Sequence, residues 1–480
     1  MRKVMFLLVV VLAALPFAAV GAQDVTPSVT VSDQVVFGDT VTIAEVVSAG
    51  NGFLVIHIDN GGSPGPVAGF APVYMGVNKD VKVAINTAMA TPMMFAMLHV
   101  DTGIVGEYEF GRVEGVDGPV VVDGAVVTPP FNAAIIDGHD QFLDGDSVTI
   151  DSVTIAQDGF LVIHAGDASS FGAVLGVTPV SAGTTADVTV EVAADGRTSV
   201  LWPMLHVDTG AVGTYEFGTV EGADGPVIVN GRVATAPIWT VPHIRASSQA
   251  VLHGDNVPAE DAMSMADSMM APTVHIHSVL AEVDGFVVIH TDNGGAPGPV
   301  AGLTWAAAGY SEHLEAPLDF EGVTITPVLW PMLHVDTGTV GTYEFGTVEG
   351  ADGPVTADGS VVTFPINAAP ALMVNDQALG EGGTLTIAEA VIDMPGWLVI
   401  HMDNAGAPGP VIGKVWLAQG RSANVVVTLD DASAAGAQVF PMLHYDTGEY
   451  GVYEFGTVEG ADAPVFVGGN VIFVPLAITG

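Results

Sequence analysis

The chain has 480 residues, of which 54 are acidic, only ten are basic and none is cysteine. This charge disfavours nucleic acid and anionic lipid as partners, because both require a basic surface on the protein. The lack of cysteine excludes disulfides, thiolate metal ligands and a thiol nucleophile. Because 49% of the residues are apolar, the chain can bury hydrophobic cores and does not have the composition of an acidic disordered tail.

Residues 1–22 have the pattern of a secretory signal peptide. Arg2 and Lys3 precede an apolar run over residues 5–15, and small residues then lead to an expected cleavage before Gln23. A membrane anchor is disfavoured, because the run is shorter than the ~20 residues that a spanning helix needs. The signal peptide holds two basic and no acidic residues, so the mature chain carries a formal charge of −46. We expect no membrane-spanning segment in the mature chain and a secreted, extracellular or cell-surface location, which would be periplasmic in an organism with an outer membrane.

One long phrase occurs four times and predicts tandem domains. It reads Met-Leu-His-x-Asp-Thr-Gly and continues as Gly-x-Tyr-Glu-Phe-Gly and Val-Glu-Gly-x-Asp-x-Pro-Val. It begins at Met97, Met204, Met332 and Met442. A second phrase lies upstream in each copy, with an aromatic residue and three aliphatic residues before a histidine, and it ends at His57, His164, His290 and His401.

Segments rich in proline and alanine separate the copies. They divide the chain into domains at residues 23–130, 131–240, 241–367 and 368–480, each large enough to bury its own core. The third copy carries an acidic, methionine-rich insertion at residues 254–272, with Met263, Met265, Met269 and Met270. An exposed loop is the favoured interpretation, and a soft ligand set for Cu(I) is the alternative.

Short segments of β-branched and aromatic residues alternate with turn residues throughout each copy. In the first copy these expected strands cover residues 29–31, 41–43, 53–59, 97–101, 108–110 and 120–122. About seven short strands per copy is typical of a β-sandwich. The sequence therefore predicts an all-β protein of four tandem immunoglobulin-like or cupredoxin-like β-sandwich domains after the signal peptide.

Histidine, methionine and aspartate recur in both phrases and form a candidate metal site. Side chains alternate along a strand, so His57 shares a face with Asp59, and Met97 shares a face with His99 and Asp101. If the two strands are neighbours, this set suits copper or zinc. The alternative is that each histidine bonds a carboxylate across the strands. The candidate metal ligands are His57, Asp59, Met97, His99 and Asp101 in copy one, His164, Met204, His206 and Asp208 in copy two, His290, Asp292, Met332, His334 and Asp336 in copy three, and His401, Asp403, Met442, His444 and Asp446 in copy four.

The glycine-rich turns support two further hypotheses. The turns after Asp59 and Asp101, with Glu114 and Asp117, offer oxygen ligands for calcium, although the same residues are ordinary turn formers. Asp-Thr-Gly is also the catalytic turn of aspartic proteases. We disfavour a protease, because a tripeptide is a weak motif, the supporting apolar-apolar-Gly segment is absent, and a dyad would not explain the histidines. We predict no catalytic residue.

The two phrases resemble an uncharacterised secreted domain of surface proteins from halophilic archaea and some bacteria. The resemblance rests on Val-Ile-His in the upstream phrase and on Met-Leu-His-x-Asp-Thr-Gly-x-x-Gly-x-Tyr-Glu-Phe, and it covers the mature chain four times. It implies an extracellular β-sandwich without an assigned activity. A weaker similarity to cupredoxins lacks their copper-binding cysteine. We therefore expect a non-catalytic binding or structural protein with an unknown extracellular partner or cation, and alternatively a protein that binds copper, zinc or calcium.

Overall fold

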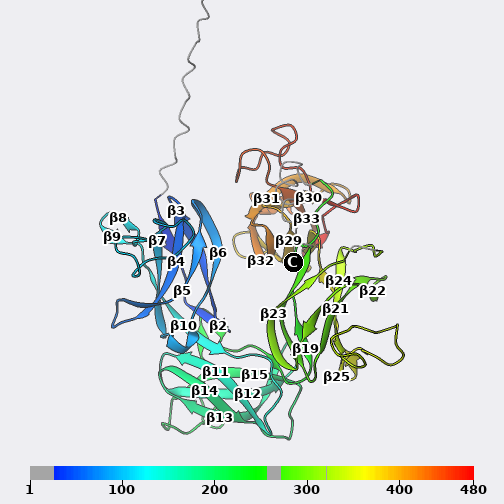
Figure 1. Cartoon of the computed structure of the whole chain (residues 1–480). Coiled ribbons are helices and arrows are strands. Elements are labelled where there is room, and N and C mark those ends of the chain that lie inside the picture. The colour runs from blue at the N-terminus through cyan, green and yellow to red at the C-terminus, as the bar shows by residue number, and fades with distance from the viewer. Residues whose placement is uncertain (1–25, 257–271, 320–321, 480) are drawn as a thin grey trace, which may run out of the picture. The chain divides into compact units, whose positions relative to one another are not determined.

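The computed structural model describes residues 26–256, 272–319 and 322–479, and these are almost entirely strands and turns (Figure 1). The predicted signal peptide and residues 257–271 of the predicted insertion lie outside the described residues. Two short 3-10 turns, η1 (Thr87–Met89) and η2 (Ala432–Ala434), are the helical segments of the described part. The chain divides into two compact units. The first consists of the residues up to Gln34 and of Asp39–Ala133, and the second consists of Val35–Gly38 and Ala134–Gly480.

The first copy is a sandwich of two antiparallel sheets. One sheet has the order β1 (Ser28–Thr30), β3 (Thr40–Ser48) and β6 (Gly76–Ala84). The facing sheet has the order β5 (Pro64–Val73), β4 (Gly52–Asp59), β7 (Met93–Val100) and the first residues of β10 (Pro130–Asp137). β8 (Val121–Val122) and β9 (Ala125–Val126) form a small hairpin, and β2 (Gln34–Phe37) pairs with β10.

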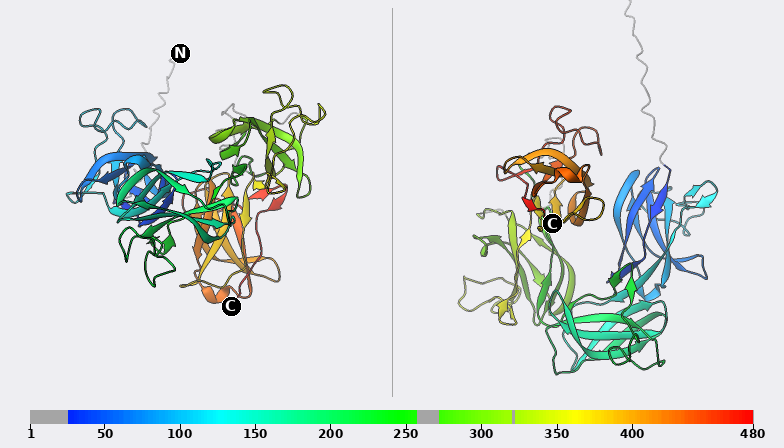
Figure 2. Two further views of the ribbon diagram at one scale, coloured as in Figure 1. Left: turned by 90° about the horizontal axis from the view of Figure 1, so that it is seen from below. Right: turned by 180° about the vertical axis from the view of Figure 1, so that it is seen from behind.

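The other three copies repeat this arrangement, which confirms the predicted tandem β-sandwiches (Figure 2). Copy two consists of the end of β10, β11 (Ser147–Ile155) and β14 (Gly183–Glu191), facing β13 (Phe171–Val180), β12 (Gly159–Gly166), β15 (Val200–Val207) and β18 (Ile238–Trp239), with a hairpin of β16 (Ile228–Val229) and β17 (Arg232–Val233). Copy three consists of β19 (His243–Arg245), β20 (Thr273–Ala281) and β23 (Gly309–Pro317), facing β22 (Pro297–Ala306), β21 (Gly285–Asp292), β24 (Val328–Val335) and β27 (Ile366–Asn367), with a hairpin of β25 (Thr356–Ala357) and β26 (Ser360–Val361). Copy four consists of β28 (Ala371–Met373), β29 (Thr384–Ile392) and β32 (Gly420–Thr428), facing β31 (Pro408–Leu417), β30 (Gly396–Asp403), β33 (Gln438–Tyr445) and β36 (Leu476–Ala477), with a hairpin of β34 (Phe466–Val467) and β35 (Asn470–Val471).

The core of each copy lies between its two sheets. In β3 the inward residues Val41 and Ile43 are fully buried, whereas the threonines beside them are exposed, as the two-residue period of a strand requires. In copy two, one cluster joins Val148 and Ile150 of the three-stranded sheet to Leu161, Ile163 and Leu205 of the four-stranded sheet. These aliphatic contacts between the sheets provide most of the driving force for folding.

The prediction of a strand at residues 108–110 is wrong. Tyr108, Glu109 and Phe110 lie in the loop between β7 and β8. Their aromatic and apolar character suits a strand, but the Glu109 amide is bonded by the Asp117 carboxylate rather than by a neighbouring strand. Local propensity is overridden here by a side-chain contact.

The first predicted domain division, between residues 130 and 131, falls inside β10. Pro130, Phe131 and Asn132 pair with β7, and Ile135, Ile136 and Asp137 pair with β11. One uninterrupted strand therefore serves as the last strand of copy one and the first strand of copy two.

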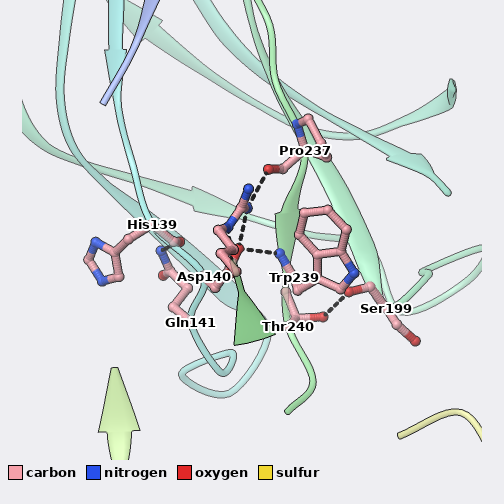
Figure 3. A network of polar contacts seen from close by, with 8 residues as sticks. His139, Asp140, Gln141, Ser199, Pro237, Trp239 and Thr240 are labelled. Atoms are coloured by element: carbon pink, nitrogen blue, oxygen red, sulfur yellow. Dashed lines mark hydrogen bonds and ion pairs between the residues drawn. The ribbon is translucent and has the colours of Figure 1, made fainter. Parts of the chain in front are cut away.

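A polar side chain just after the first strand of each copy fastens its last strand. Asp33 accepts from the Asn132 amide, Asp140 from the Trp239 amide and Asp376 from the Ala477 amide, at 2.7 to 2.9 Å, while Ser248 Oγ accepts from the Asn367 amide. Asp140 is 1% exposed and also forms an ion pair with Arg245, whose Nε lies 2.7 Å from its carboxylate. Figure 3 shows Asp140 at the centre of this network.

Candidate functional site

Two faces of the β4–β7 pair differ in chemistry. The inward face carries Leu54, Ile56 and Leu98, all fully buried. The opposite face carries three cross-strand pairs, which are Phe53 with His99, Val55 with Met97, and His57 with Phe95. The condition set by the sequence analysis is therefore met, because the two histidines lie on neighbouring strands and share a face.

The β7–β8 loop of copy one covers this outer face. Its Tyr108 lies 5.3 Å from Phe53 and 5.6 Å from His99, and its Phe110 lies 4.9 Å from His99, all measured between ring centres. His99 is 0% exposed as a result. The corresponding distances from the later histidine to the loop phenylalanine are 5.0, 5.1 and 4.8 Å in the other copies. Each loop thus encloses a second, smaller core.

A buried aspartate holds this loop closed. Asp117 accepts from the amides of Thr102 and Glu109, at 2.7 and 2.5 Å, and its own amide donates to Thr102 Oγ1 at 2.8 Å. Asp117 is 0% exposed, so these bonds replace its hydration. The equivalent residues, Asp224, Asp352 and Asp462, make the same three contacts.

Other repeated carboxylates, among them the predicted ligands Asp59 and Asp101, also accept hydrogen bonds within their own turns. Glu109 accepts from the Ile104 amide, Asp101 from the Gly106 amide, and Asp59 from the Gly62 amide. Asp59 follows a register shift in β4, and Asp101 lies beyond the end of β7, so neither follows the simple alternation of a strand. Over residues 26–256, 272–319 and 322–479, no three side chains of histidine, cysteine, aspartate or glutamate are close enough to hold a metal ion. The expected joining of carboxylates to the histidines is not observed.

The close packing of the loop explains why the third residue of Asp-Thr-Gly is glycine. Gly103 adopts φ +85°, and a Cβ at this position would lie 2.5 Å from Glu109 Oε2. The same approach of a glutamate occurs at Gly210, Gly338 and Gly448. The repeated tripeptide therefore serves the construction of the loop, which accounts for its retention without a protease function.

The two histidines of each copy form a close pair. The ring centres of His57 and His99 lie 5.8 Å apart with the planes 20° from parallel, and the other copies give 5.7 to 5.8 Å. Nδ1 of His57 lies 2.7 Å from the Gly65 carbonyl oxygen, and Nδ1 of His99 lies 2.7 Å from the Asp117 carbonyl oxygen. A carbonyl oxygen only accepts, so Nδ1 carries the proton and donates in both rings. The other six histidines bond in the same way, at 2.7 to 2.8 Å.

This tautomer leaves Nε2 as a bare acceptor in all eight rings. In the described part of the chain, seven of these Nε2 atoms are buried and have no hydrogen-bond partner, and the eighth, in His444, lies 3.2 Å from Met442 Sδ. An unpartnered buried acceptor costs about 1–3 kcal/mol. Burial lowers the pKa of His57 and of His99, and it lowers the pKa of His444 to about 4, so these rings are neutral at pH 7.

The structure thus brings together some of the candidate metal ligands. In every copy it joins the two histidines and the methionine on one covered face, and it places the aspartates at strand ends or in the turns that follow them. The loop aromatics, Tyr108 and Phe110 in copy one, were missed as members of the site, although Tyr-Glu-Phe is present in all four copies. Open surface hollows of about 460, 450 and 420 Å³ also occur in the loops of copies two, three and four. They are lined by residues 217–223 and 225, by 345–351 and 353, and by 455–461 and 463.

These features define a tandem β-sandwich protein in which each sandwich carries a histidine pair beneath a long loop. The chain belongs to the family described as "Domain of unknown function (DUF7282)", which matches residues 27–133, 134–238, 261–368 and 370–479. It is similar to "Cell surface glycoprotein 2" and "Cell surface glycoprotein 1" of Haloarcula hispanica, with 38% and 35% identity over 117 residues. Each match covers 24% of this chain and 12% of the relative, so only a small part of each relative is represented.

Solved structures give no further guide to the fold. Alpha-2-macroglobulin of Escherichia coli in its native conformation covers 95% of this chain and 30% of its own, with 10% identity and a TM-score of 0.19. Alpha-2-macroglobulin of Salmonella reacted with methylamine gives 10% identity and a TM-score of 0.17 over 97% of this chain and 31% of its own. These scores are too low to support any inference. In the described residues, no helix has the length and apolar character needed to cross a bilayer.

Proposed function

We propose that this protein is a secreted or cell-surface structural protein, in which four acidic β-sandwiches present rigid loops and carry out no catalysis. The cell-surface glycoproteins that match 117 residues of the chain support the location, as does the signal-peptide pattern of residues 1–22. The formal charge of −44 over the whole sequence suits a surface exposed to concentrated salt, where cations screen repulsion between carboxylates.

The observation that carries the proposal is how the repeated acidic residues are used. Asp101, Glu109 and Asp117 all accept hydrogen bonds from amides of their own loop. A catalytic carboxylate instead needs to be within reach of a substrate proton or reacting atom. Four copies of one internally bonded loop fit repeated structural modules better than four active sites.

Labelling of intact cells tests the proposed location. In the source organism, a membrane-impermeant reagent that modifies lysine should label this protein at Lys79, Lys82 or Lys414, while a cytoplasmic marker protein stays unlabelled. Immunogold particles should likewise decorate the cell envelope or the surrounding medium. Labelling that appears only after cell lysis would contradict a surface or secreted location.

Loop variants test the absence of catalysis at the Asp-Thr-Gly turns. Asp101→Asn keeps an acceptor for the Gly106 amide, so it should leave the loop closed and the envelope phenotype of the cells unchanged. A hydrolytic activity of the purified protein that this substitution and its counterparts at Asp208, Asp336 and Asp446 remove would show that the protein is an enzyme.

A further inference from the structure

The orientation of the two imidazole rings is fixed from opposite sides. β5, which carries Gly65, lies on the far side of β4 from β7. The segment that carries Asp117 runs along the other edge of β7, where His99 bridges to Pro119. The two Nδ1–H bonds therefore pull outward in opposite directions. Because Nε2 is on the other side of the ring from Nδ1, we infer that both bare nitrogens are turned toward the middle of the outer face, where Val55 pairs with Met97.

The spacing of the rings fits one ion between the two nitrogens. Bonds from imidazole nitrogen to a d¹⁰ metal ion are about 2.0 Å long. Two such collinear bonds, together with the radius of each ring, would place the ring centres about 6.3 Å apart. The 5.7 to 5.8 Å between ring centres in the four copies therefore fits one ion with a bent angle between its two nitrogen ligands. No hydrogen bond links the two rings in the described copies, which is consistent with a gap between their Nε2 atoms.

A methionine supplies a third donor on the same face. Met97 occupies the middle row of the outer face, between the rows that hold His99 and His57. It is 8% exposed, and its equivalents are 2%, 8% and 6% exposed. In copy four the sulfur lies 3.2 Å from His444 Nε2, within the reach of two ligands on one ion.

We propose that each copy binds one soft monovalent cation, Cu(I) or Ag(I), through the two Nε2 atoms of its histidine pair and the thioether sulfur of its methionine. The sites are His57, Met97 and His99, then His164, Met204 and His206, then His290, Met332 and His334, then His401, Met442 and His444. This site is separate from the proposed surface function and does not depend on it.

The chemistry of the donor atoms determines which ions the site favours, by their charge and their softness. Imidazole nitrogen and thioether sulfur are neutral, and thioether sulfur prefers Cu(I). A divalent ion would bring two positive charges into a covered site with no anionic ligand among these donors, at a high desolvation cost. The absence of carboxylates from the histidine pair therefore disfavours Zn²⁺ and Ca²⁺.

Titration of the full mature chain tests the proposal. Cu(I) is supplied under anaerobic conditions with ascorbate and a chromophoric Cu(I) chelator as competitor, and Ag(I) is titrated in parallel. We expect a set of four equivalent sites per chain. The methionines at positions 263, 265, 269 and 270 are replaced by leucine in a background variant, so that ions held there are counted separately.

Substitution of histidine by asparagine distinguishes the contributions of the two ring nitrogens. In His99→Asn the amide nitrogen takes the place of Nδ1 and can still donate to the Asp117 carbonyl, whereas Nε2 is removed. We expect this variant to lose one of four equivalents, and Met97→Leu to weaken binding in that copy at least about tenfold. The matched control is His139→Asn. His139 lies outside the histidine pairs and is bonded to Asp151, so this variant should still bind four equivalents of the ion. Circular dichroism and hydrogen exchange verify that each variant is folded.

X-ray absorption identifies the ligands directly. The four-site complex should show two nitrogen neighbours and one sulfur neighbour per copper. Failure of the parent chain to bind Cu(I) or Ag(I) against the competitor would overturn the proposal. It would also be overturned if folded single-copy variants at His57, His164, His290 and His401 each retained four equivalents, since the histidine pairs would then be loop anchors alone.

Discussion

The two faces of the strand pair β4–β7 contribute differently to the protein. The inward face is built of aliphatic residues, and it could be built of other aliphatic residues of similar volume without changing the fold. The outer face instead has histidine, methionine and a loop of aromatic residues at equivalent positions in all four copies. The inward face therefore determines stability, and the outer face carries polar atoms whose identity stability alone does not explain.

The largest effect should come from the inward face. Leu98→Ala should destabilise copy one by about 4 kcal/mol, because Leu98 is fully buried between the sheets. Leu98→Met, which conserves volume, is the control and should cost less than about 1.5 kcal/mol. Hydrogen exchange of peptides from copy one at increasing urea measures both. Equal exchange in the two variants would contradict the assignment of this face as the core.

The closed conformation of the β7–β8 loop should be lost without unfolding of the core. Asp117→Ala leaves the amides of Thr102 and Glu109 without acceptors and should destabilise the closed loop by about 3 kcal/mol. Exchange protection should disappear over residues 101–120 and remain in β3 and β6. Asp117→Asn keeps an acceptor and should have an intermediate effect. Simultaneous loss of protection in loop and core would mean that the two faces unfold as one unit.

A partly buried histidine outside the pairs provides a reference for acid sensitivity. Burial lowers the pKa of His243 to about 4, while Asp140 raises it and Arg245 lowers it. The neutral ring is therefore favoured by folding, and its contribution is complete above the unfolded pKa of 6.5. This contribution of the neutral ring to stability is lost as the pH falls from 6.5 to about 4, by roughly 3 kcal/mol, and it does not change further below that range.

His243→Phe is the control for this pH dependence. It keeps an aromatic ring against Trp239, whose centre lies 4.1 Å from that of His243, but it cannot titrate. The difference in unfolding midpoint between variant and parent should grow between pH 6.5 and pH 4. A difference that is constant with pH would show that His243 is not neutral in the folded chain.

The smallest stability effect is expected for the methionine of the outer face. Met97→Leu conserves volume beneath the loop and should change the unfolding free energy by less than about 1 kcal/mol. A thermal scan combined with the exchange measurement checks this. A loss as large as that of Leu98→Ala would place Met97 in the structural core and remove the contrast between the two faces.

The sequence predicted the fold because strands impose a two-residue period. The period places Met97 and His99 on one face of their strand, whereas their approach to His57 depends on the pairing of β4 with β7, which the sequence left open and the structure shows. The period fails at Asp59 and Asp101, because one follows a register shift and the other lies beyond the strand. The loop was not predictable, because the bonds of Asp117 to Thr102 and Glu109 join residues 15 and 8 positions apart, and no local pattern specifies such contacts.

The central claim is that the outer faces of the four copies hold eight imidazoles that donate from Nδ1 and leave Nε2 bare. Nitrogen-15 NMR of the histidine side chains of the full chain at pH 7 measures this directly, because the two tautomers have different ring nitrogen shifts and couplings. We expect the Nδ1–H tautomer for the eight paired histidines. Imidazolium rings, or the Nε2–H tautomer at these positions, would contradict it, because Nδ1 could not then donate to the carbonyls with Nε2 left free.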